Sequence, residues 1–443
     1  MIQTDLIIIG SGPGGYQAAR YAAQQGLKVV IVENSHAGGT CLNCGCIPTK
    51  TFAHEAELLR NPLLTDEDRL RWNFNTLLER KQAIVEQLRK GVETILQHPN
   101  ITFVKGFGRL SGIHSVTVGD EEFTAKNIII ATGSHAKLPP VDGINDPSVM
   151  TSTELLSCSS IPKQLCIIGA GVIGMEFASA FNAFGCKVTV VEYMKECLPT
   201  IDGDIAKRLR KSLEKQGVTF IMQAGVSSIQ NGTVTYEKKG KQATVVADSV
   251  LVATGRAANT DNMGLDGVGV EFNRQGIVVD DNMQTNIPGI YAIGDVNGKM
   301  MLAHAATFQG YRAINHILGK DDLINFDIMP AAIFTYPEAA SVGISEENAK
   351  QAGLDYSCGK GFYRANGKAL SMGETEGLLK LIADKDGKII GCHVFGVHAA
   401  DLVQEVTSLM NKNATVEDLK NIIHIHPTVG EILLSAAASF EQQ

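Results

Sequence analysis

The chain has 443 residues, of which 44% are hydrophobic and 19% are charged, and its formal net charge is -8. This composition excludes a fibre, a disordered chain and a membrane-embedded protein, and the length suits two or three domains. The acidic balance argues against nucleic acids and anionic membranes as main partners, so we expect small ligands. The chain runs from MIQTD straight into apolar residues, which leaves no room for a secretion signal. We therefore expect a cytoplasmic protein.

Two segments of the chain repeat one design, a buried strand, a glycine turn, a helix and a second strand. They span residues 6–33 and 165–192. Their continuous apolar runs are typical of strands in a parallel sheet buried on both faces. In such a unit the first glycine makes the tight turn, the second lets the backbone approach a pyrophosphate, and the third packs the helix on its strand. The glycines are Gly10, Gly12 and Gly15 in the first segment, and Gly169, Gly171 and Gly174 in the second.

An acidic residue closes each repeat, Glu33 in the first and Glu192 in the second, at the same interval after the first glycine. A carboxylate at this place accepts a hydrogen bond from the 2′-hydroxyl of a ribose. Glycines also mark plain turns, and a pair of buried units with no ligand is the alternative, but two complete matches predict binding of two dinucleotides. Glu192 would repel a 2′-phosphate and no arginine follows it in VVEYMKE, which favours NAD over NADP.

Three later segments extend the pattern. Residues 128–134 (IIIATGS) and 250–256 (VLVATGR) each end a strand with Ala-Thr-Gly, and residues 289–296 (GIYAIGDV) place Asp295 after a short strand and a glycine. Asp295 could accept hydrogen bonds from a hydroxylated chain, a surface turn being the alternative. From about residue 326 the pattern predicts an antiparallel meander with a DKDG hairpin, then amphipathic helices. This part has no phosphate-binding loop, so we expect it to mediate interactions or to complete a site.

Three cysteines, Cys41, Cys44 and Cys46, lie within six positions of GGTCLNCGCIPTK. A redox pair is one interpretation, because the amino terminus of a helix favours the thiolate. On a regular helix only residues three apart are close enough for a disulfide, which favours Cys41 with Cys44. Gly45 and Pro48 permit an irregular opening that could bring Cys41 and Cys46 together instead. A zinc site would need further ligands that no second CxxC or histidine pair supplies.

An ordered series of motifs along the whole chain resembles the flavoprotein disulfide reductases, and within them the branch that oxidises dihydrolipoamide. The series is GSGPGG, GGTCLNxGCIPTK, ATGS, GAGVIGMEFAS, ATGR, GIYAIGDV, FTYPEAASVG and HIHPTVGE. The resemblance implies an α/β fold with two Rossmann-like dinucleotide-binding domains and a C-terminal α+β dimerisation domain. It places an FAD-binding domain in residues 1–148 and 271–325, an NAD-binding domain in residues 149–270 and the dimerisation domain in residues 326–443.

The same resemblance implies a reaction and the residues that carry it out. Dihydrolipoamide is oxidised to lipoamide by a Cys41–Cys46 disulfide, and the electrons pass through FAD to NAD. Cys46 faces the flavin and Cys41 the substrate, while Cys44 departs from the family pattern. His426 acts as acid and base and Glu431 orients it, and both reach the disulfide of the other subunit in a homodimer. The expected partners are lipoyl domains of 2-oxo acid dehydrogenase or glycine-cleavage complexes.

The resemblance also assigns the cofactor contacts. For FAD they are the first glycine motif, Glu33 and Asp295, and for NAD they are the second glycine motif and Glu192. Lys50 and Glu176 match an ion pair beside the flavin. The other candidate contacts are Gly106, Thr132, Gly133, Gly255, Gly294, Ala303 and His304. No metal is expected.

Two alternative functions remain open. Glutathione-disulfide and mercuric-ion reductases share the architecture, but Leu42 and Ile47 fit the dihydrolipoamide branch better, and Glu192 opposes the NADPH that those enzymes use. A redox-sensing or flavin-storing protein without turnover could use Cys44 in an alternative disulfide. The His426 and Glu431 pair argues against that interpretation.

Overall fold

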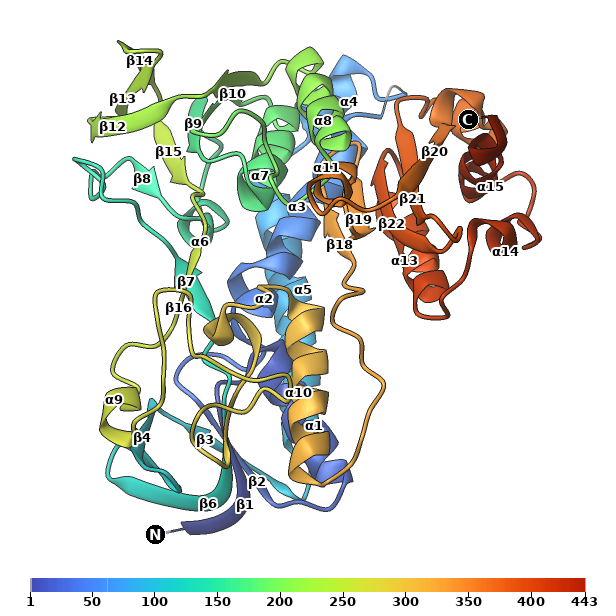
Figure 1. The fold of residues 1–443 in the computed structure, drawn as a ribbon. Helices are drawn as coiled ribbons and strands as arrows, with labels where there is room; N and C mark the ends of the chain where they lie inside the picture. The colour runs from blue at the N-terminus through green and yellow to red at the C-terminus, as the bar shows by residue number, and fades with distance from the viewer. Residues whose placement is uncertain (1, 62, 443) are drawn as a thin grey trace. The chain divides into compact units, whose positions relative to one another are not determined.

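The computed structural model describes residues 2–61 and 63–442, with positions 66, 70, 441 and 442 described without their side chains (Figure 1). The chain forms two compact units, each assembled from three separate segments. Unit 1 consists of Met1–Thr51, Asn75–Lys137 and Gly255–Ile324, and unit 2 of Phe52–Phe74, Leu138–Thr254 and Asn325–Gln443. No helix of the described part of the chain has the length and the apolar run needed to cross a membrane.

Unit 1 is organised by a sheet in the order β3-β2-β1-β6-β5-β4, with β17 paired to β6. Four strand pairs are parallel: β1 with β2, β1 with β6, β2 with β3 and β6 with β17. An antiparallel edge is formed by β4, β5 and β6. The apolar half of β1 is buried, as expected for a strand covered on both faces. The strands are β1 (Ile2–Ile9), β2 (Val29–Glu33), β3 (Ile101–Lys105), β4 (Gly108–Gly112), β5 (Ser115–Val118), β6 (Glu121–Ile130) and β17 (Ile290–Ala292).

Two helices of unit 1 pack against each other along small residues. α1 (Pro13–Gln24) begins with a proline in its first turn and buries four alanines, and α10 (Ala303–Ile317) lies alongside it (Figure 1). A Cβ on Gly310 would lie 3.1 Å from the Cβ of Ala18, so the glycine permits this close approach. The other elements of unit 1 are α2 (Gly39–Cys44), the beginning of α3 (Cys46–Leu59), most of α5 (Phe74–Leu96), β7 (Ser134–Ala136), β16 (Arg256–Ala258), α9 (Leu265–Val268) and the 3-10 helix η1 (Gly294–Asn297).

Unit 2 contains a second parallel sheet in the order β11-β10-β9-β15-β8. Beside it lies a three-stranded antiparallel sheet, β12-β13-β14. The two predicted parallel sheets are therefore confirmed. The elements are β8 (Val149–Met150), α6 (Ser152–Leu155), β9 (Gln164–Ile168), α7 (Val172–Ala183), β10 (Lys187–Glu192), α8 (Gly203–Lys215), β11 (Thr219–Met222), β12 (Gly225–Gln230), β13 (Thr233–Lys238), β14 (Lys241–Val246) and β15 (Ser249–Val252), and α4 (Asp66–Arg71) also belongs to unit 2.

The third segment of unit 2 contains an antiparallel sheet in the order β18-β19-β22-β21-β20, covered by helices. The hairpin predicted at DKDG joins β21 to β22, and the predicted amphipathic helices are α13 and α14. The elements are β18 (Ala331–Ile333), β19 (Ala339–Gly343), α11 (Glu346–Gln351), β20 (Tyr356–Phe362), η2 (Tyr363–Ala365), α12 (Gly367–Met372), β21 (Leu378–Asp384), β22 (Ile389–Phe395), α13 (Ala399–Met410), α14 (Val416–Lys420), α15 (Glu431–Ala438) and η3 (Ser439–Gln442).

Two glycines of β20 bring α15 close to this sheet. A Cβ on Gly359 would lie 2.2 Å from the carbonyl oxygen of Ala436, and one on Gly361 would lie 2.5 Å from that of Ile432. Any side chain at either position would push the helix away. The start of α15, at Glu431, is therefore fixed by backbone packing.

A buried group of charged and polar side chains joins α8 to the five-stranded antiparallel sheet of unit 2, through β21 and β22. Asp202 is the N-cap residue of α8, and both of its carboxylate oxygens accept hydrogen bonds from the Lys380 ammonium, at 2.8 and 3.0 Å. The backbone N–H of Asp202 donates to Nδ1 of His393 at 3.3 Å, and Nε2 of that ring lies 3.0 Å from the carbonyl oxygen of Ile344. A neutral ring with its proton on Nε2 satisfies both contacts, whereas a second proton on Nδ1 would face an N–H donor.

This arrangement predicts a stability that decreases in mild acid. Burial lowers the pKa of His393, so below the ordinary histidine value of about 6.5 the unfolded chain binds a proton that the folded chain does not. The free energy of unfolding should therefore decrease as the pH falls through this range. Urea denaturation at several pH values between 7.5 and 5.5 gives the slope of the free energy of unfolding against pH. In His393→Gln this slope should be smaller, by an amount that corresponds to at most about one bound proton.

The matched control is His54→Gln, which removes a histidine whose side chain is 52% exposed. Its denaturation midpoint should keep the pH dependence of the unaltered protein. An equal slope in the unaltered protein and in His393→Gln would show that His393 is not the group responsible.

Candidate active site

The loop after β1 has the geometry of a phosphate-binding turn. Gly10 has φ +105°, and a Cβ there would lie 2.3 Å from the carbonyl oxygen of Ala131. A Cβ on Gly15 would lie 1.9 Å from the carbonyl oxygen of Gly10, whereas one on Gly12 would meet nothing closer than the Cα of Gly39 at 4.0 Å. The fold itself therefore requires the first and third glycines. The second glycine leaves open the space into which a pyrophosphate would fit.

The loop after β9 repeats this geometry. Gly169 has φ +104°, and a Cβ there would lie 2.5 Å from the carbonyl oxygen of Ala253. A Cβ on Gly174 would lie 2.0 Å from the carbonyl oxygen of Gly169, while one on Gly171 would have no heavy atom within 4 Å. The two predicted glycine motifs thus have the same three-dimensional form.

A pair of alanine substitutions separates folding from binding in the second loop. We expect Gly171→Ala to change the free energy of unfolding by less than about 1 kcal/mol, since the added methyl group enters open space. The same methyl group would block the approach of a pyrophosphate, so the Kd for NAD should rise at least about tenfold. Gly174→Ala should instead destabilise the fold by roughly 1–3 kcal/mol through overpacking. Urea denaturation and nucleotide titration measure both effects, and an unchanged Kd in Gly171→Ala would contradict a phosphate-binding role for this loop.

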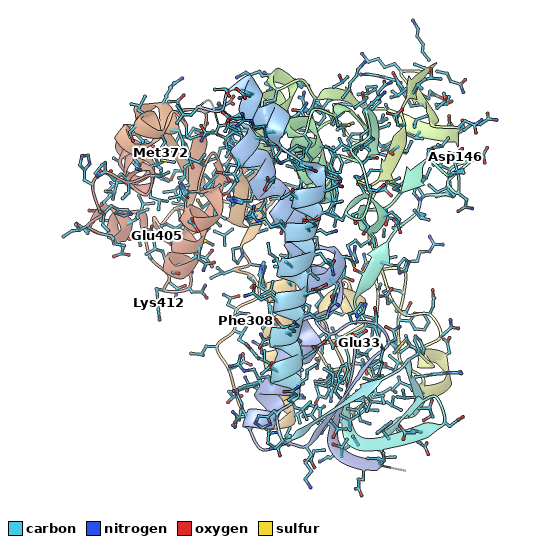
Figure 2. The ribbon with its side chains drawn as sticks, turned by 180° about the vertical axis from the view of Figure 1, so that it is seen from behind. Glu33, Asp146, Phe308, Met372, Glu405 and Lys412 are labelled. Atoms are coloured by element: carbon cyan, nitrogen blue, oxygen red, sulfur yellow. The ribbon has the colours of Figure 1, made fainter. Side chains whose placement is uncertain are left out.

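The two predicted ribose-binding carboxylates accept equivalent hydrogen bonds from the backbone. Oε2 of Glu33 accepts from the backbone N–H and the hydroxyl of Ser11, at 2.9 and 2.7 Å, and Oε1 accepts from the N–H of Ser35 at 2.8 Å (Figure 2). Oε2 of Glu192 accepts from the N–H of Ala170 at 2.6 Å, and Oε1 from that of Met194 at 2.7 Å. Each carboxylate is therefore held against the residue that follows the first glycine of its loop.

Asp295 belongs to a polar group of unit 1 that combines residues of β7, β16, η1 and α10. The hydroxyl of Ser134 donates to Oδ2 of Asp295, and the Arg256 guanidinium donates to the hydroxyl and the carbonyl oxygen of Ser134, at 2.6 and 2.7 Å. Nε of Arg256 also lies 3.7 Å from Oδ2 of Asp295. The N–H of Gly294 donates to Oε1 of Gln309 on α10 at 2.7 Å, which fixes the turn that carries the aspartate. Sequence reasoning missed Ser134, Arg256 and Gln309, although the motifs ATGS and ATGR contain the first two.

The other predicted cofactor contacts occupy loop or helix-end positions. Gly106 follows β3 and donates its N–H to the carbonyl oxygen of Glu33, Thr132 donates its hydroxyl to the carbonyl oxygen of Asn259, and Gly133 and Gly255 have positive φ. Ala303 and His304 begin α10. Lys50 is on α3 in unit 1, whereas Glu176 is buried on α7 in unit 2 and accepts from the N–H of Phe334 at 2.9 Å. The predicted Lys50–Glu176 pair stays a prediction.

Cys41 and Cys46 are brought together by a break between two helices. α2 ends at Cys44 and α3 begins at Cys46, with Gly45 between them at φ -137° and ψ -112°. A Cβ on Gly45 would lie 2.9 Å from the carbonyl oxygen of Thr40 and 3.3 Å from the Cα of Cys41, so the chain folds back against α2. The Cys41 and Cys46 side chains are hydrogen-bonded, and this bond together with burial raises the pKa of Cys41. The irregular opening predicted at Gly45 is therefore confirmed.

A side-chain amide holds α2 in place. Nδ2 of Asn43 donates to the carbonyl oxygens of Ala37 and Gly39, at 3.0 and 2.9 Å, and its Oδ1 accepts from Nε of Arg89 on α5 at 2.9 Å. These three bonds tie the helix to the loop before it and to α5. The motif GGTCLNxGCIPTK contains Asn43, whereas Arg89 lies outside every quoted motif.

The two histidines of HIHPTVGE have different environments. His426 is 80% exposed, and its Nδ1 lies 2.9 Å from Oε1 of Glu431. The other carboxylate oxygen accepts from the N–H of Thr428 at 2.9 Å, and this bond together with His426 lowers the pKa of Glu431. His424 is only 6% exposed and pairs with Glu405 on α13 at 2.9 Å. Glu405 is labelled in Figure 2. With Nδ1 engaged by a carboxylate, Nε2 of His426 is the ring nitrogen left to exchange protons.

Comparisons with known proteins agree with these features. Residues 4–310 match the family model described as pyridine nucleotide-disulphide oxidoreductase, and residues 329–437 match the dimerisation domain of that family. The chain is 40% identical to the dihydrolipoyl dehydrogenase of Bacillus subtilis (strain 168), over 98% of this chain and 96% of that protein. It is 38% identical to the mitochondrial dihydrolipoyl dehydrogenase 1 of Arabidopsis thaliana, over 98% and 90%. A solved Cu(II) complex of the HOCl-induced flavoprotein disulfide reductase RclA from Escherichia coli is similar in structure, with a TM-score of 0.89, 31% identity and 99% coverage of both chains.

Proposed function

Because the chain belongs to the pyridine nucleotide-disulphide oxidoreductase family, we propose that it is a dihydrolipoyl dehydrogenase, which oxidises dihydrolipoamide to lipoamide and reduces NAD to NADH. The observation that carries the proposal is the contact between Cys41 and Cys46 in the unit that also holds the first dinucleotide loop. A thiol pair of this kind is the chemical group that exchanges two electrons with a dithiol substrate.

Residues of both units fit the two cofactors that this reaction needs. In unit 1 the open space at Gly12 would receive the FAD pyrophosphate, Glu33 a ribose hydroxyl and Asp295 the hydroxylated chain. In unit 2 the open space at Gly171 and the carboxylate of Glu192 would do the same for NAD. When bound, FAD supplies a two-electron carrier between the thiols and the nicotinamide.

The thiol chemistry is carried by the chain's own residues. A substrate thiolate attacks the Cys41 sulfur of the Cys41–Cys46 disulfide, an S–S bond forms to the substrate, and Cys46 leaves as a thiolate. The second substrate thiolate then attacks the substrate's own sulfur, which closes lipoamide and releases Cys41. The hydrogen bond in the reduced pair keeps the proton on Cys41, because it raises the pKa of that thiol.

Acid–base chemistry falls to His426 in this proposal. Each substrate thiol must lose its proton before it attacks, and Nε2 of His426 would accept it while Glu431 stabilises the imidazolium. We place this histidine in the active site of the partner subunit of a homodimer. The match of residues 329–437 to a dimerisation domain supports that part of the proposal.

Nucleotide choice and biological context complete the proposal. Glu192 is fixed by two backbone amides and would repel the 2′-phosphate of NADP, so NAD is the preferred cofactor. The dithiol substrate would be carried by lipoyl domains of 2-oxo acid dehydrogenase or glycine-cleavage complexes. We place the protein in the cytoplasm, a reducing compartment that keeps its other cysteines as thiols.

A direct assay tests the proposal. The purified, FAD-loaded protein is given dihydrolipoamide and NAD, and NADH formation is followed by absorbance. NADPH with glutathione disulfide is run beside it. Rapid NADH formation with little NADPH oxidation is the expected result. NADPH-dependent reduction of glutathione disulfide without turnover of dihydrolipoamide would overturn the substrate assignment.

A further inference from the structure

Cys41 has a second cysteine neighbour that the proposed reaction does not use. α2 is helical from Gly39 to Cys44, so Cys44 lies one turn after Cys41 on the same helix. Cα atoms three residues apart on a helix are about 5 Å apart, which lies within the range that a disulfide can bridge. Cys41 is therefore flanked by Cys44 along the helix and by Cys46 across the break at Gly45.

The position of Cys44 differs from that of most other cysteines in the chain. Cys41, Cys44 and Cys46 are all partly exposed, whereas the cysteines of the sheets and their loops are buried. Thiol–disulfide exchange needs a thiol that can reach its target sulfur from an accessible position. The buried cysteines are Cys166, Cys186, Cys197, Cys358 and Cys392.

We propose that Cys44 is a third exchange thiol of the redox centre, which attacks the Cys41 sulfur and forms a Cys41–Cys44 disulfide. Starting from the Cys41–Cys46 disulfide, the Cys44 thiolate forms the new S–S bond while the old one breaks, and Cys46 leaves as a thiolate. The number of disulfides is unchanged, so the step consumes no oxidant. The proposal rests on the proposed function only in taking Cys41–Cys46 as the starting disulfide.

The same attack would resolve a mixed disulfide between Cys41 and a monothiol such as glutathione. The Cys44 thiolate forms a bond to the Cys41 sulfur, the bond to glutathione breaks, and glutathione leaves as its thiolate. Cys44 would thus act on the substrate-facing cysteine from within α2. The Cys41–Cys44 disulfide does not include Cys46. It would therefore disconnect Cys41 from the cysteine that is expected to face the flavin.

The local structure allows the exchange without moving the backbone of the helix. Asn43 lies between the two cysteines and is bonded to the carbonyl oxygens of Ala37 and Gly39 and to Arg89, so α2 is held in place. Cys41 and Cys44 therefore stay one turn apart on a fixed helix while the Cys41 sulfur changes partner.

The test uses two variants of the full-length, FAD-loaded protein. Cys46→Ser keeps Cys41 and Cys44, and the double variant Cys44→Ser/Cys46→Ser keeps only Cys41. Both are exposed to glutathione disulfide and quenched with acid at timed intervals. Unreacted thiols are alkylated, and peptides 38–50 are analysed by mass spectrometry. In Cys46→Ser we expect Cys41 to lose glutathione and to form a disulfide with Cys44. In the double variant the glutathione adduct should persist at least about tenfold longer, because an intramolecular thiol has a high effective concentration.

Equal lifetimes of the adduct in the two variants would overturn the proposal. Flavin content and circular dichroism show whether each variant is folded, and Cys46→Ala replaces Cys46→Ser if the serine variant is not. The readout uses neither dihydrolipoamide nor NAD. Failure here with NADH formation intact in the unaltered protein would therefore reject the role of Cys44 alone, whereas loss of dihydrolipoamide turnover in the unaltered protein would reject the proposed function.

Discussion

Replacement of Cys46 by serine is expected to lower NADH formation from dihydrolipoamide by at least about a thousandfold, because a serine oxygen neither forms the disulfide nor leaves as a thiolate. Cys46 follows Gly45, where the chain folds back so that Cys41 and Cys46 bond through their side chains. A Cys41–Cys44 disulfide could still be attacked by the substrate, but without Cys46 no thiol faces the flavin to pass the electrons on. Steady-state turnover at saturating dihydrolipoamide and NAD measures the loss, with flavin content confirming that the cofactor is still bound.

Cys158→Ser is the matched control for this substitution. Cys158 is partly exposed, like Cys46, but lies on the other compact unit. The control should keep turnover within about twofold of the unaltered enzyme, as is usual for a substitution outside the reacting groups. If Cys46→Ser kept more than a tenth of the turnover, the electrons would have to pass through a different pair of thiols.

The features that sequence reasoning predicted well depend on short-range geometry. The positive φ of Gly10 and Gly169 and the close contacts of Gly15 and Gly174 arise within single strand–turn–helix units, so residue spacing reveals them. The acidic end of each second strand belongs to the same local unit. The DKDG hairpin is likewise local.

The features that it missed depend on contacts between distant segments. Ser134 and Arg256 meet because β7 pairs with β16 across more than a hundred residues, and this pairing places both side chains beside Asp295. The pair of His426 with Glu431 is predicted and spans only five residues, whereas the contact of His424 with Glu405 of α13 is not predicted. No periodicity or spacing indicates such distant partners, since they depend on how the separate elements pack.

His426→Gln is expected to lower kcat for dihydrolipoamide by roughly a hundredfold to ten-thousandfold, the usual contribution of a general base. Glutamine fills similar space but accepts no proton from the substrate thiol. Glu431→Gln should lower kcat less, because it keeps a hydrogen-bonding group beside Nδ1 and removes only the charge that stabilises the imidazolium. His424→Gln is the neighbouring control, since its ring is buried against Glu405. It should affect stability more than turnover, and an equal loss of kcat in both histidine variants would contradict the assignment.

A mixed dimer decides whether His426 serves its own subunit or the partner. In a dimer of one Cys46→Ser subunit and one His426→Gln subunit, a shared site would combine the intact cysteines of the second with the intact histidine of the first. Equal amounts of the two inactive variants, dissociated and reassociated, would then form active mixed dimers and regain about a quarter of the unaltered turnover. If each subunit used its own histidine, no site in any dimer would be complete and the mixture would stay inactive. Recovered activity would thus explain why the histidine and its carboxylate lie on a C-terminal part that has no dinucleotide loop.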